Sequence, residues 1–531
     1  MQHFAGSLQH VLAELERVDL LIQAQVARVR SLHADDEQFR GLYISEQELD
    51  ALLRQPVGRP YWMSQEYNPQ TQFEPTLNEI SHRINLRKQE SQSQGIELRL
   101  DTLQHRFHLD PLEIDALLIC LAVELDLRYE RLYAYLQDDV TKKKASVDLV
   151  LNLLYPSAEQ KLEARWYFSS NASLVRYRLL EIFEDPSQPH SPLLATYLKI
   201  DDRIADYLLG YDELDPRIQS YATKVAPRRS LDELVLDEGL KRGLMQRLTR
   251  GHSNEDQVVV HLKGPYGVGK QSVAEAVCRG RGLNLLAVDT ERLAAEEGSS
   301  YEKALRLINR EARLQKAALY WDGFDVLLTD QNTKLRKVFL TNLEESPLVS
   351  FLAGEVSWQP EGLRPSVQFA SIDLPRPSFT ERSRLWIMAL EGHDCVDADI
   401  DLAALASKFK FTSGQIHGAV STARNLSLWR SPETGGIAEN DLYEASRLQS
   451  NQKLSALARK ITPKYQWTDI VLPADRLAQL REICNHVKYR DRVYSEWGFG
   501  EKLSLGKGLS VLFAGPSGTG KTMSAEIIAR E

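Results

Sequence analysis

The chain opens with apolar residues spaced like one face of a helix. From residue 8 they recur every three or four positions, separated by charged residues and glutamines, at Leu8, Val11, Leu12, Leu15, Val18, Leu21, Ile22 and Val26. This period predicts a long amphipathic helix. Most amphipathic helices pack on their own domain, so self-packing is favoured here, with a partner helix as the alternative.

Residues 100–225 are dense in helical patterns interrupted by short extended segments. In residues 110–129, Asp110 can cap a helix and Pro111 suits its first turn. Shorter helical pieces are expected at Leu149–Leu154 and Ser191–Ile204. This alternation suits a winged-helix-like module. Such modules bind DNA in some proteins and other proteins elsewhere, so the fold alone leaves the partner open.

Two later segments share the order strand, glycine-rich loop, helix. The first begins at Val258 with the sequence VVVHLKGPYGVGKQS and continues as a helix through Val277. The second begins at Leu509 with the sequence LSVLFAGPSGTGKT, in which a strand is expected over Val511–Ala514 and a helix from Met523. The interval between the loops suits one complete nucleotide-binding domain, a small helical lid and a linker.

The second loop matches G-x-x-x-x-G-K-T, the Walker A pattern of a phosphate-binding P-loop. Small residues there let consecutive backbone N–H groups surround an anion at a helix N-terminus. Lys521 is the expected catalytic residue, meeting the β- and γ-phosphates of a nucleoside triphosphate, and the Thr522 hydroxyl is the expected Mg²⁺ ligand. The predicted binding residues are Gly515, Pro516, Ser517, Gly518, Thr519, Gly520, Lys521 and Thr522.

The first loop keeps the glycines and the lysine but lacks the hydroxyl. Its expected phosphate-binding residues are Gly264, Gly267, Gly269 and Lys270. Gln271 stands where a Ser or Thr side chain would reach Mg²⁺, so metal coordination should be weakened at this loop.

A second departure lies downstream of the first loop. Ala317–Asp322 reads as a strand whose terminal Asp322 would orient the ion through water. The next residue, where a carboxylate would activate the attacking water, is Gly323, which cannot accept a proton. Three interpretations of this module stay open: nucleotide binding without efficient hydrolysis, a purely structural role, and activity through substitute groups.

With both loops and the Asp322 strand in view, the chain resembles the AAA+ ATPases. Residues 374–386 are similar to the segment that enters the family's lid, and residues 411–416 to the glycine-containing start of a lid helix. Residues 350–355 lie where the sensor-1 strand should end, without the usual Asn. Residues 465–473 look like the linker onto the adenine pocket of the second module, and residues 497–499 precede its P-loop strand.

The resemblance implies an α/β P-loop NTPase (AAA+) fold with a mainly helical N-terminal region containing a winged helix, and ATP with Mg²⁺ as cofactors. It also implies a homo-oligomer, a hexameric ring, because the family's arginine finger comes from a neighbouring subunit. The N-terminal 230 residues look like those of a bacterial subgroup of tandem AAA+ proteins, some of which accompany contractile injection particles.

The predicted domain boundaries follow from the same resemblance. They are an amphipathic helix region at 1–60, a helical, winged-helix-like domain at 61–230, a degenerate first AAA+ large subdomain at 231–395, its helical lid at 396–450, and a linker with the start of a second AAA+ domain at 451–531. A P-loop domain needs several more strands beyond its first loop, so we expect the sequence to be a fragment truncated after the second Walker A motif.

Composition narrows the remaining possibilities. The 531 residues are 43% hydrophobic and 26% charged, and the net charge of −9 argues against a nucleic-acid surface over the whole chain. Residues 142–144 and 228–229 form short basic clusters that read as solvated surface. Cys120, Cys278, Cys395 and Cys484 lie far apart, which suits free thiols in a reducing compartment. No apolar run approaches the about 20 residues of a membrane span, so we expect a cytoplasmic protein without membrane contact.

The leading functional prediction is an ATP hydrolase of the AAA+ class. Hydrolysis at the second module would drive remodelling or assembly of a protein substrate. The sequence as given does not contain the water-activating carboxylate of that module, so little turnover is expected from it. The alternatives are a nucleotide-regulated binding scaffold and a DNA-associated ATPase that binds nucleic acid through the N-terminal region.

Overall fold

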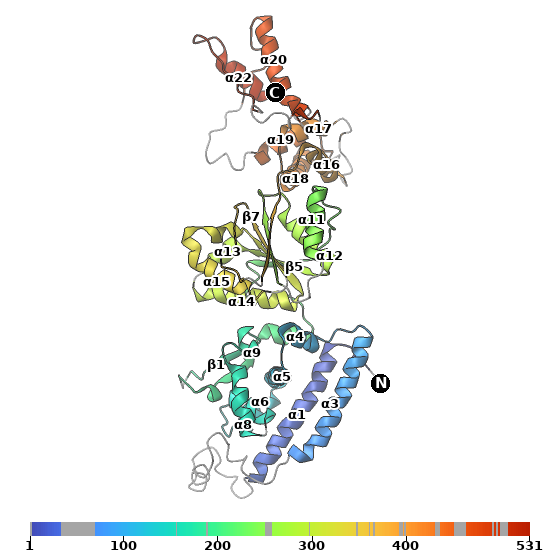
Figure 1. Ribbon diagram of the computed structural model, residues 1–531, viewed down its shortest axis with the longest axis vertical. Coiled ribbons are helices and arrows are strands. Elements are labelled where there is room, and N and C mark those ends of the chain that lie inside the picture. The colour runs from blue at the N-terminus through green and yellow to red at the C-terminus, as the bar shows by residue number, and fades with distance from the viewer. Residues whose placement is uncertain are drawn as a thin grey trace. The chain divides into compact units, whose positions relative to one another are not determined.

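The structure is a computed structural model, whose ribbon is drawn in Figure 1. It describes residues 3–32, 70–155, 157–186, 189–249, 257–296, 298–346, 349–360, 362–364, 367–391, 397, 400–430, 436–450, 463–490, 493–494, 497–499 and 508–531. The chain forms two compact units. The first comprises residues 1–224, 292–317 and 337–347, and the second comprises residues 225–291, 318–336 and 348–531.

The first unit is mainly helical. The predicted N-terminal helix is confirmed as α1 (Ser7–Leu32), and its Val11, Leu15 and Val18 are buried in the core of this unit, which confirms self-packing. The expected region 1–60 otherwise falls largely outside the described residues. The further helices are α3 (Gln70–Ser93), α4 (Arg99–Phe107), α5 (Pro111–Leu125), α6 (Arg128–Leu136), α7 (Val147–Leu154), α8 (Ala158–Ala164), α9 (Ser173–Arg176), α10 (Asp202–Leu209) and α14 (Ser299–Leu314), with short 3₁₀ turns η2 (Arg165–Phe168) and η3 (Leu193–Ala195).

Helix α5 lies at the centre of this core. Pro111 occupies its first turn as predicted, and the Glu113 carboxylate accepts a hydrogen bond from the Asp110 N–H at 3.0 Å. The helix is apolar around most of its circumference, and Leu117, Leu118 and Leu121 are fully buried. A helix with this pattern is stable only when other elements cover all its faces.

The expectation of a helix at Ser191–Ile204 is wrong. That segment contains η3 and the strand β2 (Tyr197–Ile200), which pairs antiparallel with β1 (Leu180–Phe183) before α10 begins. Leu198 and Ile200 are buried whereas Tyr197 and Lys199 are partly exposed, which is the period of two of a strand with one covered face. The apolar run is too short for periodicity alone to separate a strand from a helix.

A six-stranded sheet organises the large part of the second unit. Its strands are β3 (Ala222–Val225), β4 (Val258–Lys263), β5 (Asn284–Asp289), β6 (Ala317–Asp322), β7 (Val349–Gly354) and β8 (Gln368–Asp373), in the spatial order β3-β5-β6-β7-β4-β8. Strand β4 runs parallel to both β7 and β8, so Val260 lies opposite Phe351 and Ala370. In such a sheet ligands bind beyond the carboxyl ends of the strands, which is where β4 enters the first glycine loop.

Further helices and turns accompany this sheet. They are α11 (Glu238–Thr249), α12 (Lys270–Arg281), α13 (Thr290–Ala294), η4 (Phe324–Leu328), η5 (Asp330–Asn332) and α15 (Thr333–Leu343). The strands expected at Val258 and at Ala317–Asp322 are therefore confirmed as β4 and β6, and the helix expected through Val277 is confirmed as α12. Both strands are almost continuously buried, as parallel strands covered on two faces must be.

A small helical subdomain follows β8. It consists of α16 (Phe379–Leu390), α17 (Leu402–Lys408), α18 (Ser413–Arg430) and α19 (Glu439–Ser450). Trp386, Leu405, Ile416 and Leu442 are fully buried in its own core. Ser378 and Glu381 cap the start of α16 reciprocally, so the chain enters this subdomain at a defined angle.

The C-terminal residues form an apolar cluster of their own. It joins Ile470, Leu480 of α20 (Ala474–Lys488) and Ile527 of α22 (Lys521–Arg530). The strand expected at Val511–Ala514 is not formed among the described residues; that segment has no regular secondary structure and no ladder partner, and Leu512 is 89% exposed. A strand is defined by its hydrogen-bonded neighbours, so an apolar run alone does not make one.

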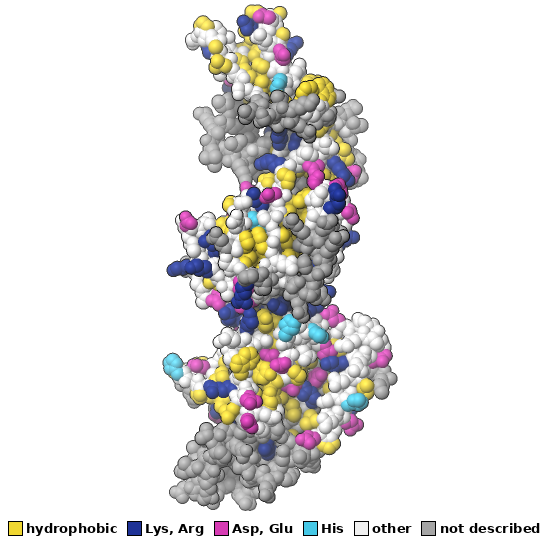
Figure 2. All heavy atoms as spheres, in the orientation of Figure 1, with side chains coloured by type: hydrophobic (Ala, Val, Ile, Leu, Met, Phe, Trp, Pro, Cys, Tyr) yellow, Lys and Arg dark blue, Asp and Glu magenta, His cyan; other side chains and the backbone are white. Residues whose placement is uncertain are grey.

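The surface of the described residues carries charges of both signs. In the view of Figure 2, acidic and basic side chains are interspersed over the coloured surface. None of the helices in the described part of the chain combines the length and the apolar character needed to cross a membrane.

Candidate functional site

The first P-loop joins β4 to α12. Gly267 and Gly269 have φ of +75° and +101°, a region that residues with a Cβ rarely adopt, so the loop conformation depends on glycine there. Gly264 is needed for another reason: a Cβ on it would lie 2.5 Å from the carbonyl oxygen of Leu374. The structure therefore brings Gly264, Gly267, Gly269 and Lys270 together in one tight loop at the N-terminus of α12.

Lys270 is half-buried and folds back onto this loop. Its Nζ donates hydrogen bonds to the carbonyl oxygens of Gly264 at 2.7 Å and of Pro265 at 3.3 Å. Burial lowers the pKa of Lys270, while the negative charges of Glu355, Asp322 and Asp325 act in the opposite direction. The ammonium group thus faces carboxylates from the ends of two strands.

The first module departs from the pattern of an active ATPase at Gln271 and Gly323. Other side chains lie beside both positions. The Gln271 amide donates to Glu275 Oε1 at 2.9 Å, one turn further along α12. Gly323 has φ of +69°, and a Cβ on it would lie 3.1 Å from Glu291 Cγ and 3.4 Å from Glu291 Oε1. The Glu291 side chain, from α13, therefore fills space beside the missing carboxylate. No local sequence pattern points to Glu291, because helix α14 and strand β6 separate it from Gly323 in the chain.

The start of the lid subdomain contacts the first P-loop directly. The Gly414 N–H donates to the Gly267 carbonyl oxygen at 2.7 Å, and a Cβ on Gly267 would lie 2.7 Å from Thr412 Oγ1. Thr412 is itself held by Gln415, whose Oε1 accepts from the Thr412 N–H at 3.0 Å. The residues singled out at 411–416 thus lie at the site, and their motion relative to the loop would alter it.

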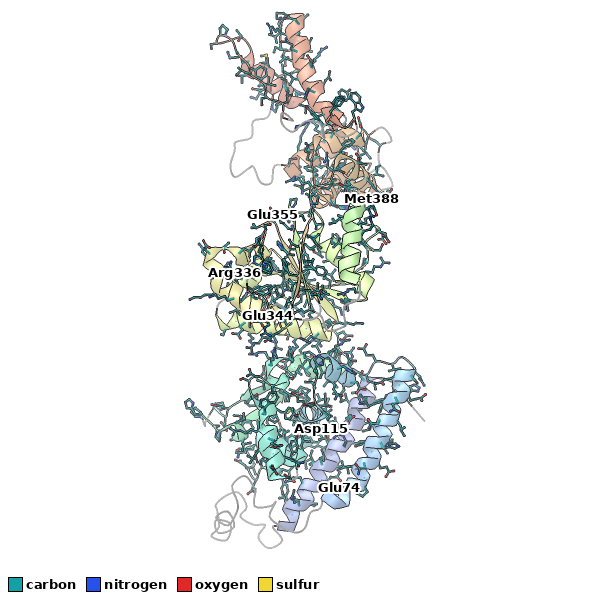
Figure 3. The ribbon with its side chains drawn as sticks, in the orientation of Figure 1. Glu74, Asp115, Arg336, Glu344, Glu355 and Met388 are labelled. Atoms are coloured by element: carbon teal, nitrogen blue, oxygen red, sulfur yellow. The ribbon has the colours of Figure 1, made fainter. Side chains whose placement is uncertain are left out.

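A cavity of about 90 Å³ opens beside Gly269. Apolar groups of Leu236, Val268, Val273 and Met388 line much of it, together with His417 and Arg229; Met388 is labelled in Figure 3. Burial lowers the pKa of His417, as does the Arg229 charge, so the neutral imidazole is favoured. Polar and apolar groups contribute about equally to the lining of this recess, which lies beside the phosphate loop.

The second P-loop has the same local geometry at the N-terminus of α22. Gly515, Gly518 and Gly520 have φ of +156°, +84° and +84°. Lys521 Nζ donates to the carbonyl oxygens of Gly515 at 2.8 Å and Pro516 at 2.6 Å. The structure therefore gathers residues 515–522 into one loop, with the Thr522 side chain exposed at its end.

The residues of this second loop fit a polyphosphate with a magnesium ion. Glycines in left-handed conformations turn backbone N–H groups toward one point at a helix N-terminus, where the helix dipole favours an anion. The hydrogen bonds that Lys521 makes within the described residues go to carbonyl oxygens, so its charge is not neutralised by them. The predicted linker segment lies nearby, since Ile470 and Ile527 share one apolar cluster.

A parallel sheet whose inner strand enters a glycine-rich loop and helix, with a helical lid on that loop, defines an α/β P-loop NTPase fold. The mainly helical N-terminal region is also accounted for, because residues 1–222 match the family model "Winged helix domain, variant". The predicted fold class, an α/β P-loop NTPase preceded by a mainly helical region with a winged helix, is therefore confirmed.

Among known proteins, the chain is similar to "Peroxisomal ATPase PEX6" of Homo sapiens. The two are 29% identical over 308 residues, which cover 51% of this chain and 30% of that protein. The chain thus spans under a third of the length of this relative. The similarity supports homology to AAA+ ATPases.

Two solved structures are also similar in part. One, reported as "Structural Basis for Katanin Self-Assembly", is 20% identical with a TM-score of 0.37 and covers 45% of this chain and 93% of that chain. The other, "Crystal structure of FIGL-1 AAA domain", is 17% identical with a TM-score of 0.35 and covers 44% of this chain and 90% of that chain.

Proposed function

We propose that this chain is part of an AAA+-type ATPase that binds and hydrolyses ATP at its second P-loop and uses the cycle to remodel or assemble a protein substrate. The observation that carries the proposal is the second loop itself. It combines three left-handed glycines, Lys521 and an exposed Thr522 at the start of α22. Similarity to an ATPase supports the same activity class.

Each residue of the second loop has a definite task in this proposal. The backbone N–H groups at the start of α22 bind phosphate oxygens, which are favoured there by the helix dipole. Lys521 leaves the carbonyl oxygens of Gly515 and Pro516 and contacts the phosphates, where it stabilises negative charge. The Thr522 hydroxyl holds Mg²⁺, which neutralises charge on the phosphates when it is bound.

The first module is degenerate for hydrolysis in this proposal. Gln271 has no hydroxyl for the ion, and Gly323 has no carboxylate for the attacking water. The cavity beside Gly269 leaves room for a base, so binding without efficient turnover and a purely structural role are both compatible with its shape. Glu291 is the candidate substitute group if this module has residual activity.

The remaining parts of the proposal concern the assembly. We place the protein in the cytoplasm, as a hexameric ring in which the winged-helix region recognises a protein client. An association with contractile injection particles belongs to the same proposal and rests on the sequence resemblance.

Paired lysine variants test the central point. Lys521→Ala should weaken binding of the fluorescent analogue mant-ATP to this chain by at least about tenfold, since it removes a charge-assisted contact worth about 1.5–3 kcal/mol. Lys270→Ala is the matched control at the first loop and should change the total binding little. Equal binding by the wild-type chain and Lys521→Ala would refute the assignment of the second loop.

The scaffold alternative makes a different prediction for the same variant. If nucleotide serves only regulation, Lys521→Ala should keep client assembly intact. If the protein is instead an ATP-driven remodelling enzyme, Lys521→Ala should abolish remodelling of the client while the subunits still assemble. Size-exclusion chromatography with light scattering measures that assembly.

A further inference from the structure

Glu355 lies directly after β7 and reaches the first P-loop. Its Oε1 accepts a hydrogen bond from the N–H of Tyr266, the third residue of that loop, at 2.8 Å. Figure 3 labels Glu355 at the end of the sheet where β7 ends. A carboxylate from the neighbouring strand is therefore bound to the backbone of an anion-binding loop.

The chain holds Glu355 in this place through a second carboxylate. Asp325, in η4, accepts hydrogen bonds from the backbone N–H groups of Glu355 at 2.5 Å and Val356 at 3.2 Å. A Cβ on Gly354 would lie 2.3 Å from Asp325 Oδ1, so only glycine allows this approach. The turn after β7 is thereby fixed with Glu355 beside the loop.

Three carboxylates act on the lysine of the first loop. Lys270 lies in the field of Glu355, Asp322 and Asp325, with Glu355 making the largest attractive contribution. A nucleoside polyphosphate would bring several more negative charges next to these carboxylates, and like charges at such range repel strongly when partly buried. Lys521 makes the same kind of hydrogen bonds as Lys270, since each ammonium group donates to two carbonyl oxygens of its own loop.

We propose that Glu355 is an internal substitute for a phosphate group and a specificity-determining residue of the first P-loop. Its carboxylate satisfies the loop's Tyr266 N–H and offsets the Lys270 charge, so that this module binds nucleoside polyphosphates weakly and stays ordered without them. The second loop is then the one that responds to nucleotide. This inference rests on the proposed function, which assigns ATP binding to the second loop and describes the first module as degenerate.

The test uses the whole chain carrying Lys521→Ala, so that binding at the second loop is weakened and a gain at the first loop can be measured. Titration with mant-ATP gives the affinity of this background and of the same chain with Glu355→Gln. Glutamine keeps the shape and an acceptor for Tyr266 but loses the charge, so the affinity should rise by about tenfold. Adding Lys270→Ala should reverse the gain, because the lysine is then no longer available to the phosphates.

Two controls separate charge removal at the loop from other effects. Glu439→Gln removes the same charge from an exposed position in the first turn of α19, and it should leave the affinity unchanged. Glu355→Ala also removes the acceptor for Tyr266, and it should raise the affinity as Glu355→Gln does. The gain should shrink at high salt, since screening weakens charge repulsion.

Unchanged mant-ATP affinity in both Glu355 variants, with circular dichroism and melting like those of the background, would overturn the inference. So would a gain that persists without Lys270. The proposed function is judged separately, by whether binding to the chain with Glu355 intact depends on Lys521. The inference and the proposed function can therefore be refuted independently of each other.

Discussion

At the residue scale, a buried histidine accompanies the strand that carries the first P-loop. His261, in β4, is fully buried, and its ring lies 6.1 Å from that of Phe324 and 6.2 Å from that of Trp358, measured between centroids. Burial lowers the pKa of His261; Asp325 and Asp373 oppose this effect, and Lys263 adds to it. The imidazole is therefore held in its neutral form by its surroundings.

From the lowered pKa of His261 we predict that the folded chain loses stability in mild acid. Because the folded-state pKa of His261 lies below the ordinary histidine value of about 6.5, the unfolded chain binds a proton there at a pH at which the folded chain does not. The stabilisation is complete above that value and declines as the pH falls below it. Melting of the wild-type chain should shift downward between pH 7.5 and 5.5, and His261→Phe should reduce the shift.

His417 needs its own control, because burial lowers its pKa in the same direction. His417→Asn should remove a separate part of the pH dependence. Identical melting shifts in the wild type and His261→Phe would contradict the assignment to β4.

The glycine before Glu355 gives a second prediction at this scale. Gly354→Ala should destabilise the second unit by about 1–3 kcal/mol, since the new methyl group meets Asp325 Oδ1 and must displace it. Gly280→Ala is the matched control: it lies inside α12 with nothing within 4 Å, and alanine there should be neutral or slightly stabilising. Urea denaturation of both variants measures the difference, and equal midpoints would refute the steric argument.

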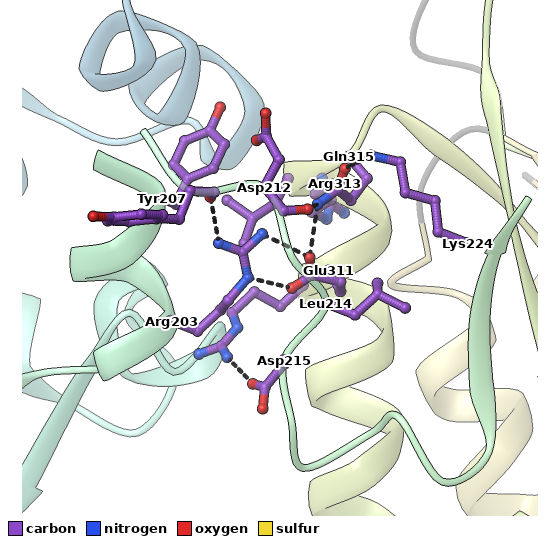
Figure 4. A network of polar contacts seen from close by, with 12 residues as sticks. Arg203, Tyr207, Asp212, Leu214, Asp215, Lys224, Glu311, Arg313 and Gln315 are labelled. Atoms are coloured by element: carbon purple, nitrogen blue, oxygen red, sulfur yellow. Dashed lines mark hydrogen bonds and ion pairs between the residues drawn. The ribbon is translucent and has the colours of Figure 1, made fainter. Parts of the chain in front are cut away.

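At the scale of elements, α14 is anchored in the first unit by buried ion pairs (Figure 4). Arg203 Nη2 lies 2.8 Å from Glu311 Oε1, and Arg310 Nη2 lies 2.6 Å from Asp215 Oδ2. Burial opposes ionisation of Asp215, but hydrogen bonds from Arg217 and the charge of Arg310 outweigh it and hold the pKa of Asp215 below its usual value. Partnered charges of this kind tolerate burial, whereas unpartnered ones do not.

Breaking this anchor should be costly. Arg310→Met should destabilise the first unit by about 1.5–3 kcal/mol, because Asp201 and Asp215 lose one of the two arginines that they share while Arg217 remains. The double variant Arg310→Met/Asp215→Asn should recover part of the loss. Urea unfolding with hydrogen exchange on α14 reports both effects.

An exposed pair on the same helix provides the comparison. Arg306 and Glu302 are 40% and 47% exposed and form an i,i+4 contact at 2.6 Å. Arg306→Met should therefore cost less than about 0.5 kcal/mol. A loss in Arg310→Met as small as in Arg306→Met would mean that the buried network does not stabilise α14.

At the scale of the whole molecule, the net charge argues against a DNA-associated ATPase. The net charge is −9, and charges of both signs are interspersed over the surface in Figure 2. We expect weak binding of labelled duplex DNA in fluorescence anisotropy, with a shallow dependence on salt between 50 and 200 mM, since few phosphates would be neutralised. A steep slope with tight binding would favour the DNA-associated ATPase instead.

Much of the fold could be predicted from local sequence patterns. The apolar stripe of α1, the buried run of β4 and the glycines of both loops are each readable within one segment. Predictions were wrong where the period of the apolar residues was ambiguous. The helix expected at Ser191–Ile204 is replaced in part by β2, and the strand expected at Val511–Ala514 has no partner among the described residues. Strand pairing is a long-range property, so short apolar runs do not decide it.

The sequence by itself determined the two phosphate loops, because their chemistry depends on residues adjacent in the chain: Lys521 with Thr522, and Lys270 with Gln271. Only the tertiary structure decided what surrounds them. Glu355 reaches Tyr266 across 89 positions, and Arg203 reaches Glu311 across 108. Such contacts arise when strands and helices pack, since folding brings charges together that no local pattern links. Residues adjacent in the chain thus determine the chemistry of a loop, and the fold determines its electrostatic environment.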